Sequence, residues 1–312
     1  MMNIVTIILY ELKMMLRNRV NMILLLVMPV AMIALMGYAM KPFLNTGTSG
    51  AEKLPELYAN SGKSDIGREF DAAISAAASK YGISEKELDD IRSRLENDTA
   101  DGFLDIETVS DPEERTINSF QFFGAGMLIF FLLTCGMGLG TNILSERADR
   151  VFFRIISFPV THNQYLAGKA AANALIGLFQ AATVILLTSL LFGVDWGGNY
   201  AGLFMVVMEV MLVTSGIAII FSNILNSAKA LTTLLIVLYW MMTFVSGSFT
   251  PMPAFEAVSP YMVNRWAFEV LTGFMTGKGL AEVSNYLLML LAAGLAFWAA
   301  GVMLYKRRVS NE

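Results

Sequence analysis

The chain of 312 residues is 55% hydrophobic and only 15% charged, with a net charge of −4 and a mean hydropathy of +0.57. Average soluble domains carry about 25% charged residues, so this composition indicates an integral membrane protein and excludes an ordinary soluble domain. We expect membrane lipid and no nucleic acid as partners. The single cysteine, Cys135, excludes an internal disulfide and any site built on a Cys-x-x-Cys pair.

The N-terminal region predicts a surface helix followed by a membrane span. Residues 1–19 place apolar side chains at helical spacing with Lys13 and Arg17 on the other side, which is typical of an amphipathic in-plane helix. Residues 20–40 are an apolar run long enough to cross the ~30 Å hydrocarbon core. A cleaved signal peptide is the alternative, but its apolar core would be only about 7 to 15 residues long, before a small-residue cleavage site.

Residues 41–118 form the only sizeable polar block. They hold nine Lys or Arg against seventeen Asp or Glu, a net charge of −8. Residues 64–80 and 84–97 have helical patterns, and residues 102–109 fit a short strand. The block therefore predicts a small acidic α+β domain inserted between the first two spans, with no catalytic motif.

Five more apolar runs are long enough to cross a membrane: residues 119–144, 164–192, 200–221, 230–249 and 284–305. The sequence thus predicts an all-α membrane protein with six transmembrane helices and both termini on the same side. Lys and Arg gather in the short loop of residues 145–163 and in the tail, residues 306–312. By the positive-inside rule these segments and both termini are predicted to be cytoplasmic in a plasma-membrane protein, with the acidic domain outside.

The loop of residues 145–163 reads as an amphipathic helix that Pro159 stops. Arg147, Arg150 and Arg154 recur on one face, and aromatic and aliphatic side chains lie elsewhere around it. Two interpretations fit this pattern. The helix could lie on the membrane surface with its arginines at the lipid headgroups, or it could dock its exposed aromatic residues into a groove on a cytosolic partner.

Three glycines, Gly136, Gly138 and Gly140, lie within the second predicted span. A dinucleotide-binding loop would need a preceding strand and a βαβ unit, and neither is predicted here. Close helix packing is therefore the expected role of these glycines.

Glu209 is an isolated carboxylate deep within the fourth predicted span. Such a group should face the bundle interior or a wet cavity. It could line a substrate path or couple transport to a proton or cation. The alternative is a structural hydrogen bond to a neighbouring span.

Residues 250–283 are too interrupted by proline and charge for a simple span. Short helices that partly re-enter the outer leaflet fit this pattern. The alternative is an ordinary extracellular loop anchored at the interface by Tyr261 and Trp266.

The order of these features resembles the permease of type-2 ABC exporters over essentially the whole chain. The resemblance rests on the in-plane basic helix, the external domain and four motifs: Glu146-Arg147, Ser157-Phe-Pro159-Val160 with Tyr165-Leu-Ala-Gly168-Lys169, Ser246-Gly-Ser-Phe-Thr-Pro251, and Ser259-Pro-Tyr261. It implies a six-span half-transporter that pairs with a second copy or a related permease and binds two cytosolic ATPase subunits. ATP and Mg would bind in those subunits, and this chain would hold no cofactor or metal.

The resemblance also assigns roles to particular residues. It makes the loop after the second span the coupling helix, which favours the docking interpretation, with ATPase-coupling residues Glu146, Arg147, Arg150, Phe152, Phe153, Arg154 and Ile156. It makes the proline-rich segment an extracellular gate, with Phe249, Pro251, Pro253, Pro260 and Tyr261. Glu209 stays a candidate for the substrate path.

The expected function is the ATP-driven export of a hydrophobic or amphiphilic substrate such as a drug, an antimicrobial peptide or a lipid-like molecule. One alternative is a membrane sensor whose external domain binds a peptide or cation and signals to another membrane protein without transport. Another is an intramembrane enzyme that uses Glu209, but one carboxylate without a partner acid, base or metal set is poor support. The sequence does not identify the cargo.

Overall fold

The computed structural model describes residues 4–17, 19–44, 117–149, 161–249, 255 and 257–309. The chain divides into two compact units, one of Met1–Lys41 with Arg115–Glu312 and one of Pro42–Glu114. Nearly all of the second unit, and with it the predicted α+β domain, lies outside the described residues. Over the described ranges the chain folds into helices and connecting segments, with no strand, so the predicted all-α membrane part is confirmed.

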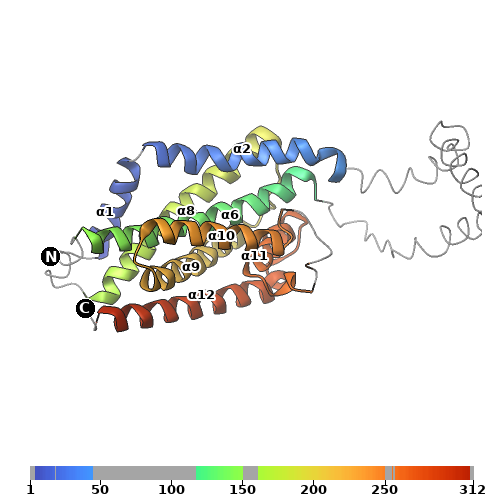
Figure 1. Ribbon diagram of the computed structural model, residues 1–312. Coiled ribbons are helices and arrows are strands. Elements are labelled where there is room, and N and C mark those ends of the chain that lie inside the picture. The colour runs from blue at the N-terminus through green and yellow to red at the C-terminus, as the bar shows by residue number, and fades with distance from the viewer. Residues whose placement is uncertain are drawn as a thin grey trace, which may run out of the picture. The chain divides into compact units, whose positions relative to one another are not determined.

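The first unit is a bundle of long helices with shorter ones at each end (Figure 1). In chain order the elements are α1 (Ile4–Arg17), α2 (Arg19–Leu44), α6 (Ser119–Ala148), α8 (His162–Phe192), α9 (Tyr200–Ile224), α10 (Ala228–Val245), the 3-10 turn η2 (Ser259–Tyr261), α11 (Val263–Met275) and α12 (Leu280–Val309).

Polar caps set where the long helices begin and end. Asn118 and Gln121 form a capping box at the start of α6, and Thr161 and Gln164 form another at the start of α8. Helix α8 ends at Gly193, whose φ of 64° is left-handed. Helix α10 ends at Val245, four residues before the end of the predicted fifth span, because the chain turns there at a glycine with positive φ.

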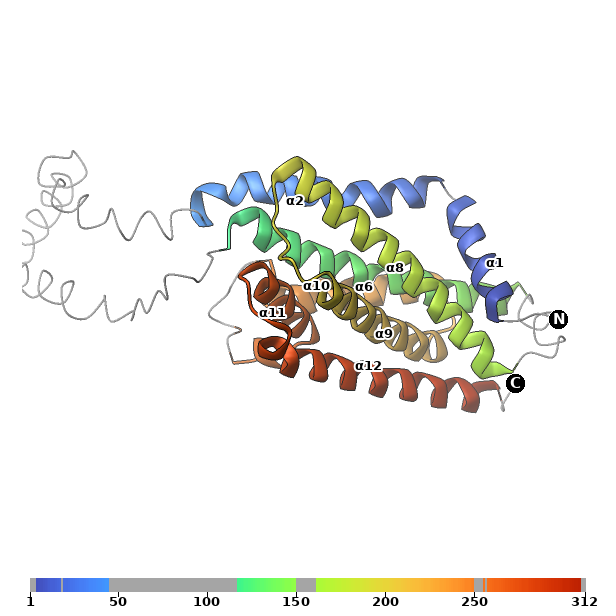
Figure 2. The same ribbon diagram turned by 180° about the vertical axis from the view of Figure 1, so that it is seen from behind.

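Helix α9 is the centre of the bundle, packed against α12 on one side and against α6 and α8 on the other (Figures 1 and 2). The α6–α9 contact is close at Gly136, where an added Cβ would overlap the Thr214 hydroxyl. At Gly216 an added Cβ would lie 2.7 Å from the backbone carbonyl carbon of Phe297 in α12. These small residues let helix backbones approach directly, the packing expected for Gly136.

Five of the described helices are long and apolar enough to cross a membrane: α6, α8, α9, α10 and α12. Helix α2 contributes a shorter apolar stretch, Leu26–Ala39. The chain is therefore a multi-pass membrane protein, and the sixth span stays a prediction. Helix α1 packs mainly on α8 and turns sharply away from the line of α2 (Figures 1 and 2). Its place in the membrane plane stays a prediction.

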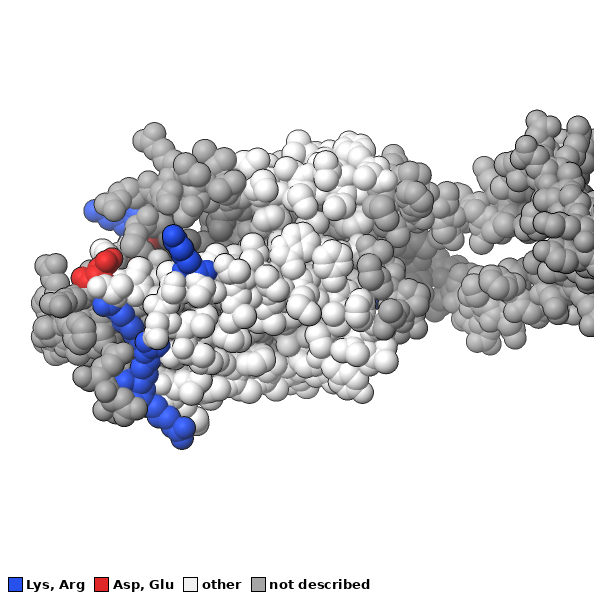
Figure 3. All heavy atoms as spheres, viewed as in Figure 1, with Lys and Arg blue, Asp and Glu red and all other residues white. Residues whose placement is uncertain are grey.

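Lys and Arg side chains gather at one end of the bundle (Figure 3). In the view of Figure 3, Lys and Arg gather where the described chain approaches both termini, and the length of the bundle beside them is uncharged. We call this the terminal end, because α1 begins and α12 finishes there (Figure 1). The last turn of α12 carries Lys306, Arg307 and Arg308.

Candidate functional site

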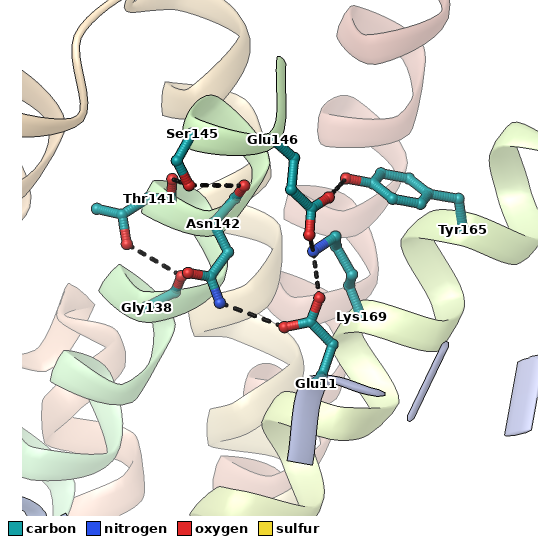
Figure 4. Close-up of polar contacts among 8 residues, drawn as sticks. All are labelled: Glu11, Gly138, Thr141, Asn142, Ser145, Glu146, Tyr165 and Lys169. Atoms are coloured by element: carbon teal, nitrogen blue, oxygen red, sulfur yellow. Dashed lines mark hydrogen bonds and ion pairs between the residues drawn. The ribbon is translucent and has the colours of Figure 1, made fainter. Parts of the chain in front are cut away.

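A buried ionic network joins three helices at the terminal end (Figure 4). The Lys169 ammonium of α8 lies between two carboxylates, Glu11 of α1 and Glu146 of α6, and forms an ion pair with each. Its Nζ lies 2.7 Å from Glu146 Oε1. The three residues are only 3–7% exposed, so the network that joins α1, α6 and α8 is buried.

Neutral donors complete the network. The Tyr165 hydroxyl donates to Glu146 Oε2 at 2.6 Å, and the Asn142 amide donates to Glu11 Oε2 at 3.2 Å. Each carboxylate therefore accepts one bond from Lys169 and one from a neutral group (Figure 4). Buried charges persist only when they are paired and hydrogen-bonded in this way. Removing Lys169 would leave two buried carboxylates without their cation.

A small cavity adjoins the network. Its volume is about 10 Å³, and its polar lining comes from Glu11, Asn142, Lys169 and Asn173. That is roughly the room and the number of polar partners that one buried water needs. The site is therefore suited to a single water that hydrogen-bonds to Lys169 and Asn173.

The residue next to Glu146 points to a different pair of helices. Arg147 Nη2 donates to Asn223 Oδ1 of α9 at 3.1 Å, and its guanidinium stacks 4.9 Å from the ring centroid of Tyr305 in α12. Tyr305 is fully buried and packs beside Tyr165. The last turn of α6 thus contacts α1 and α8 through Glu146, and α9 and α12 through Arg147.

Comparison with known proteins identifies the family. The model of the ABC-2 family transporter protein matches residues 104–303, more than half of the chain. The chain belongs to the ABC-2 transporter family. The resemblance to a type-2 ABC permease is thereby confirmed.

A relative supports the same assignment. The linearmycin resistance permease protein LnrN of Bacillus subtilis is 27% identical over 205 residues, which cover 63% of this chain and 52% of the relative. The chain therefore spans about half the length of this curated relative. No solved structure is detectably similar.

The structure describes only two of the residues that are predicted to couple this chain to an ATPase. Glu146 and Arg147 lie on the last turn of α6 and point into the bundle, toward the groups described above. The other predicted coupling residues lie outside the described residues: Arg150, Phe152, Phe153, Arg154 and Ile156. The docking interpretation of that segment stays a prediction.

The predicted substrate-path residue is buried in an apolar seam. Glu209 is 8% exposed, and its Oε2 atom has no hydrogen-bond partner among the described residues. Helical spacing puts it on the side of α9 that carries Leu212 and Gly216, which pack on α12 at Gly294 and Phe297. The opposite side of α9, at Thr214, packs on α6. Glu209 therefore faces the α9–α12 seam.

The predicted gate residues lie at the other end of the bundle. Phe249 is buried among aromatic rings, and Tyr261 is 75% exposed on η2. The carbonyl of Pro260 accepts from the Trp266 indole at 2.7 Å, and the Ser259 hydroxyl donates to the Ser246 carbonyl at the end of α10, so η2 is tied to that end. Pro251 and Pro253 lie outside the described residues, and the gate role stays a prediction.

Several residues of the terminal end were not predicted from sequence. Glu11 follows Ile7 by one turn on the buried side of α1, and an acidic residue in an otherwise apolar stripe is the signal that could have found it. No local sequence pattern marks Asn142, Asn223 or Arg308, because their hydrogen-bond partners come from helices distant in the sequence. Among the described residues, no group of three or more His, Cys, Asp or Glu is placed to hold a metal ion.

Proposed function

We propose that the chain is the transmembrane permease subunit of an ATP-driven exporter, powered by a separate ATPase that binds ATP and Mg. The observation that carries this proposal is the ionic network at the root of the loop of residues 145–163, within a chain of the ABC-2 family. Glu146 is two residues from the end of α6, so a displacement of that loop would move it directly.

The network suits force transmission between the loop and the helices. A partner that moves the loop moves the last turn of α6, and the Glu146–Lys169–Glu11 contacts then carry α8 and α1 with it. Because the ion pairs are buried and directional, these helix ends shift together rather than slide past one another. ATP binding in the partner would thereby shift the population between inward-open and outward-open states.

This assignment makes the terminal end cytoplasmic. The Lys and Arg side chains gathered there fit the positive-inside rule, with both termini on that side of the plasma membrane. The predicted gate segment around η2 and α11 then lies on the outer side, where the 3-10 turn and short helix suit a segment that covers a path.

The face formed by α6 and α10 suits a second permease copy and a hydrophobic cargo. Helix α10 leaves apolar side chains exposed along its length: Leu234, Ile236, Val237, Trp240, Met241 and Phe244. Two exposed rings on this face, Trp240 and Phe244, pack on the buried rings of Phe130 and Phe249, with neighbouring centroids 4.9–5.7 Å apart. We assign the face to a cavity between two copies, where aromatic surface binds apolar or amphiphilic molecules, with lipid covering the other exposed helices.

The cargo class is supported by the relative. LnrN is named for linearmycin resistance, and resistance by a permease fits removal of a toxic compound from the cell. We therefore propose a hydrophobic toxin or drug as the class of substrate.

The test is to purify the tagged full chain from its native cell in mild detergent, identify the proteins that accompany it, and measure ATP hydrolysis by the complex. We expect an ATPase whose activity depends on this chain, and linearmycin is the first probe for stimulation. A preparation without an associated ATPase, even after crosslinking through residues 145–163, would contradict the exporter and favour the membrane sensor.

A further inference from the structure

A guanidinium closes the end of α9. Arg308 of α12 donates through Nη1 to the carbonyls of Ser222, Asn223 and Leu225, at 3.4, 2.6 and 3.3 Å. Its Nη2 donates to Asn226 Oδ1 at 2.6 Å. The last carbonyls of a helix lack intrahelical partners and carry partial negative charge, so a cation here is favourable. Arg308 therefore fixes the α9–α10 turn to α12.

The same turn is held from α6. Asn223 donates through Nδ2 to the Ile219 carbonyl of its own helix at 2.7 Å. This bond orients the amide so that Oδ1 accepts from Arg147 Nη2 at 3.1 Å. Asn223 thus accepts one hydrogen bond from Arg147 at its side-chain oxygen and one from Arg308 at its backbone carbonyl. The ends of α6, α9 and α12 therefore meet at one residue.

Helices α9 and α12 are built to move as a pair. They run in the same direction, since Leu212, Gly216 and Ile219 meet Gly294, Phe297 and Gly301 in order. Their backbones nearly touch at Gly216, and close-packed helices without intervening side chains transmit displacement with little give. At the far end both helices pack against α11, next to the predicted gate.

We propose that Arg147, Asn223 and Arg308 form a joint that passes movement of the loop after α6 to the α9–α12 pair, with Asn223 as its positioning residue. The inference rests on the proposed exporter function. Movement of the last turn of α6 then reaches two pairs of helices. Glu146 passes it to α8 and α1 through Lys169, and Arg147 passes it to α9 and α12 through Asn223. The consequence is that the α9–α10 turn keeps a fixed distance from the end of α6 throughout the transport cycle.

The experiment places spin labels at Ala148 and Lys229, both exposed, with the buried Cys135 replaced by Ser. The label-to-label distance is measured in the permease alone and in its ATPase complex, nucleotide-free and trapped with ADP and vanadate. Two variants are compared. Asn223→Ala removes the acceptor for Arg147, whereas Asn223→Asp keeps an acceptor oxygen for Arg147 and loses only the donor to the Ile219 carbonyl.

We expect an unchanged distance on trapping for the parent and for Asn223→Asp. For Asn223→Ala we expect a distribution that broadens in the permease alone and shifts on trapping, with permease-dependent ATP hydrolysis lowered several-fold. A distance that changes on trapping in the parent would overturn the joint, as would an Asn223→Ala distribution as narrow as the parent's. If no ATPase associates with the chain, the exporter proposal fails instead, and the permease-alone distances still decide whether Asn223 holds the turn.

Discussion

The middle of the bundle and its terminal end are held together by different forces. In the middle, α6, α9 and α12 meet mainly through apolar side chains and glycines, with one hydrogen bond from the Thr214 hydroxyl to the Leu133 carbonyl, and Glu209 is an isolated carboxylate. At the terminal end, five helices meet through charged and amide groups with fixed partners. Apolar packing is nondirectional, whereas ionic hydrogen bonds specify geometry. The difference teaches that contacts in the middle set how closely the helices pack, while contacts at the terminal end set which helix ends are paired.

The largest expected effect comes from removing the cation of the network. Lys169→Met leaves Glu11 and Glu146 buried without a positive partner, so we expect the free energy of unfolding to fall by about 3–5 kcal/mol. Thermal unfolding in detergent measures this, with the exposed Lys229→Met as the control. Equal stability of the two variants would show that the network is not buried in the folded protein.

A matched variant separates charge from shape. The triple change Glu11→Gln, Lys169→Met and Glu146→Gln removes all three charges while keeping acceptor oxygens for Tyr165 and Asn142. Replacing every member of a buried ionic group is much less destabilising than removing one partner, because no unpaired charge is left buried. We therefore expect it to unfold close to the parent protein; a loss as large as that of Lys169→Met alone would refute this electrostatic explanation.

The next effect tests the packing of the middle. Gly136→Ala puts a methyl group into the Thr214 hydroxyl, so α6 and α9 must separate. We expect a loss of about 1–3 kcal/mol in the free energy of unfolding. Gly198→Ala is the control, because an added Cβ there meets nothing within 4 Å. A neutral Gly136→Ala would mean that the two helices are not in close contact.

A smaller effect is expected at the lone carboxylate. Glu209→Gln keeps the side-chain shape, so we expect less than about 1 kcal/mol change in the free energy of unfolding. If Glu209 takes part in transport, the pH profile of ATP hydrolysis by the complex changes, while the neighbouring exposed Met205→Gln leaves it unchanged. An unaltered profile with full activity would assign Glu209 a structural role.

The smallest effect on stability is expected in the loop itself. Changing both Phe152 and Phe153 to Ala should leave unfolding unchanged but weaken association with the ATPase about tenfold, roughly 1.4 kcal/mol, because aromatic residues dominate docking surfaces. Phe179→Ala, an exposed position on α8, is the control. Unchanged co-purification and ATPase activity of the double variant would rule out the docking interpretation.

Sequence reasoning found the long helices because apolar runs are local signals. It found the family from the order of motifs along the chain. It placed α6 from residue 119 onward, as observed, since Asn118 caps it. It also singled out Glu146 and Arg147, but from a motif rather than from their contacts. The resemblance assigned them to coupling with the ATPase, which stays a prediction, and their contacts lie within the bundle.

The contacts of the terminal end could not be read from the sequence. Glu11 and Lys169 are 158 positions apart, and Arg147 and Asn223 are 76 apart. Pairing them requires knowing that α1 packs on α8 and that α6 ends beside α9. Periodicity gives the face on which a residue lies but not the helix that covers that face.

The most direct test of the account measures ATP hydrolysis by the complex that contains the charge-neutral triple variant. We predict that this variant folds, inserts and binds the ATPase as the parent does, and that hydrolysis falls to the rate of the ATPase without a permease, because the loop no longer moves α1 and α8. Hydrolysis at the parent rate in a stably assembled complex would contradict the claim that the buried network couples the loop to the helices.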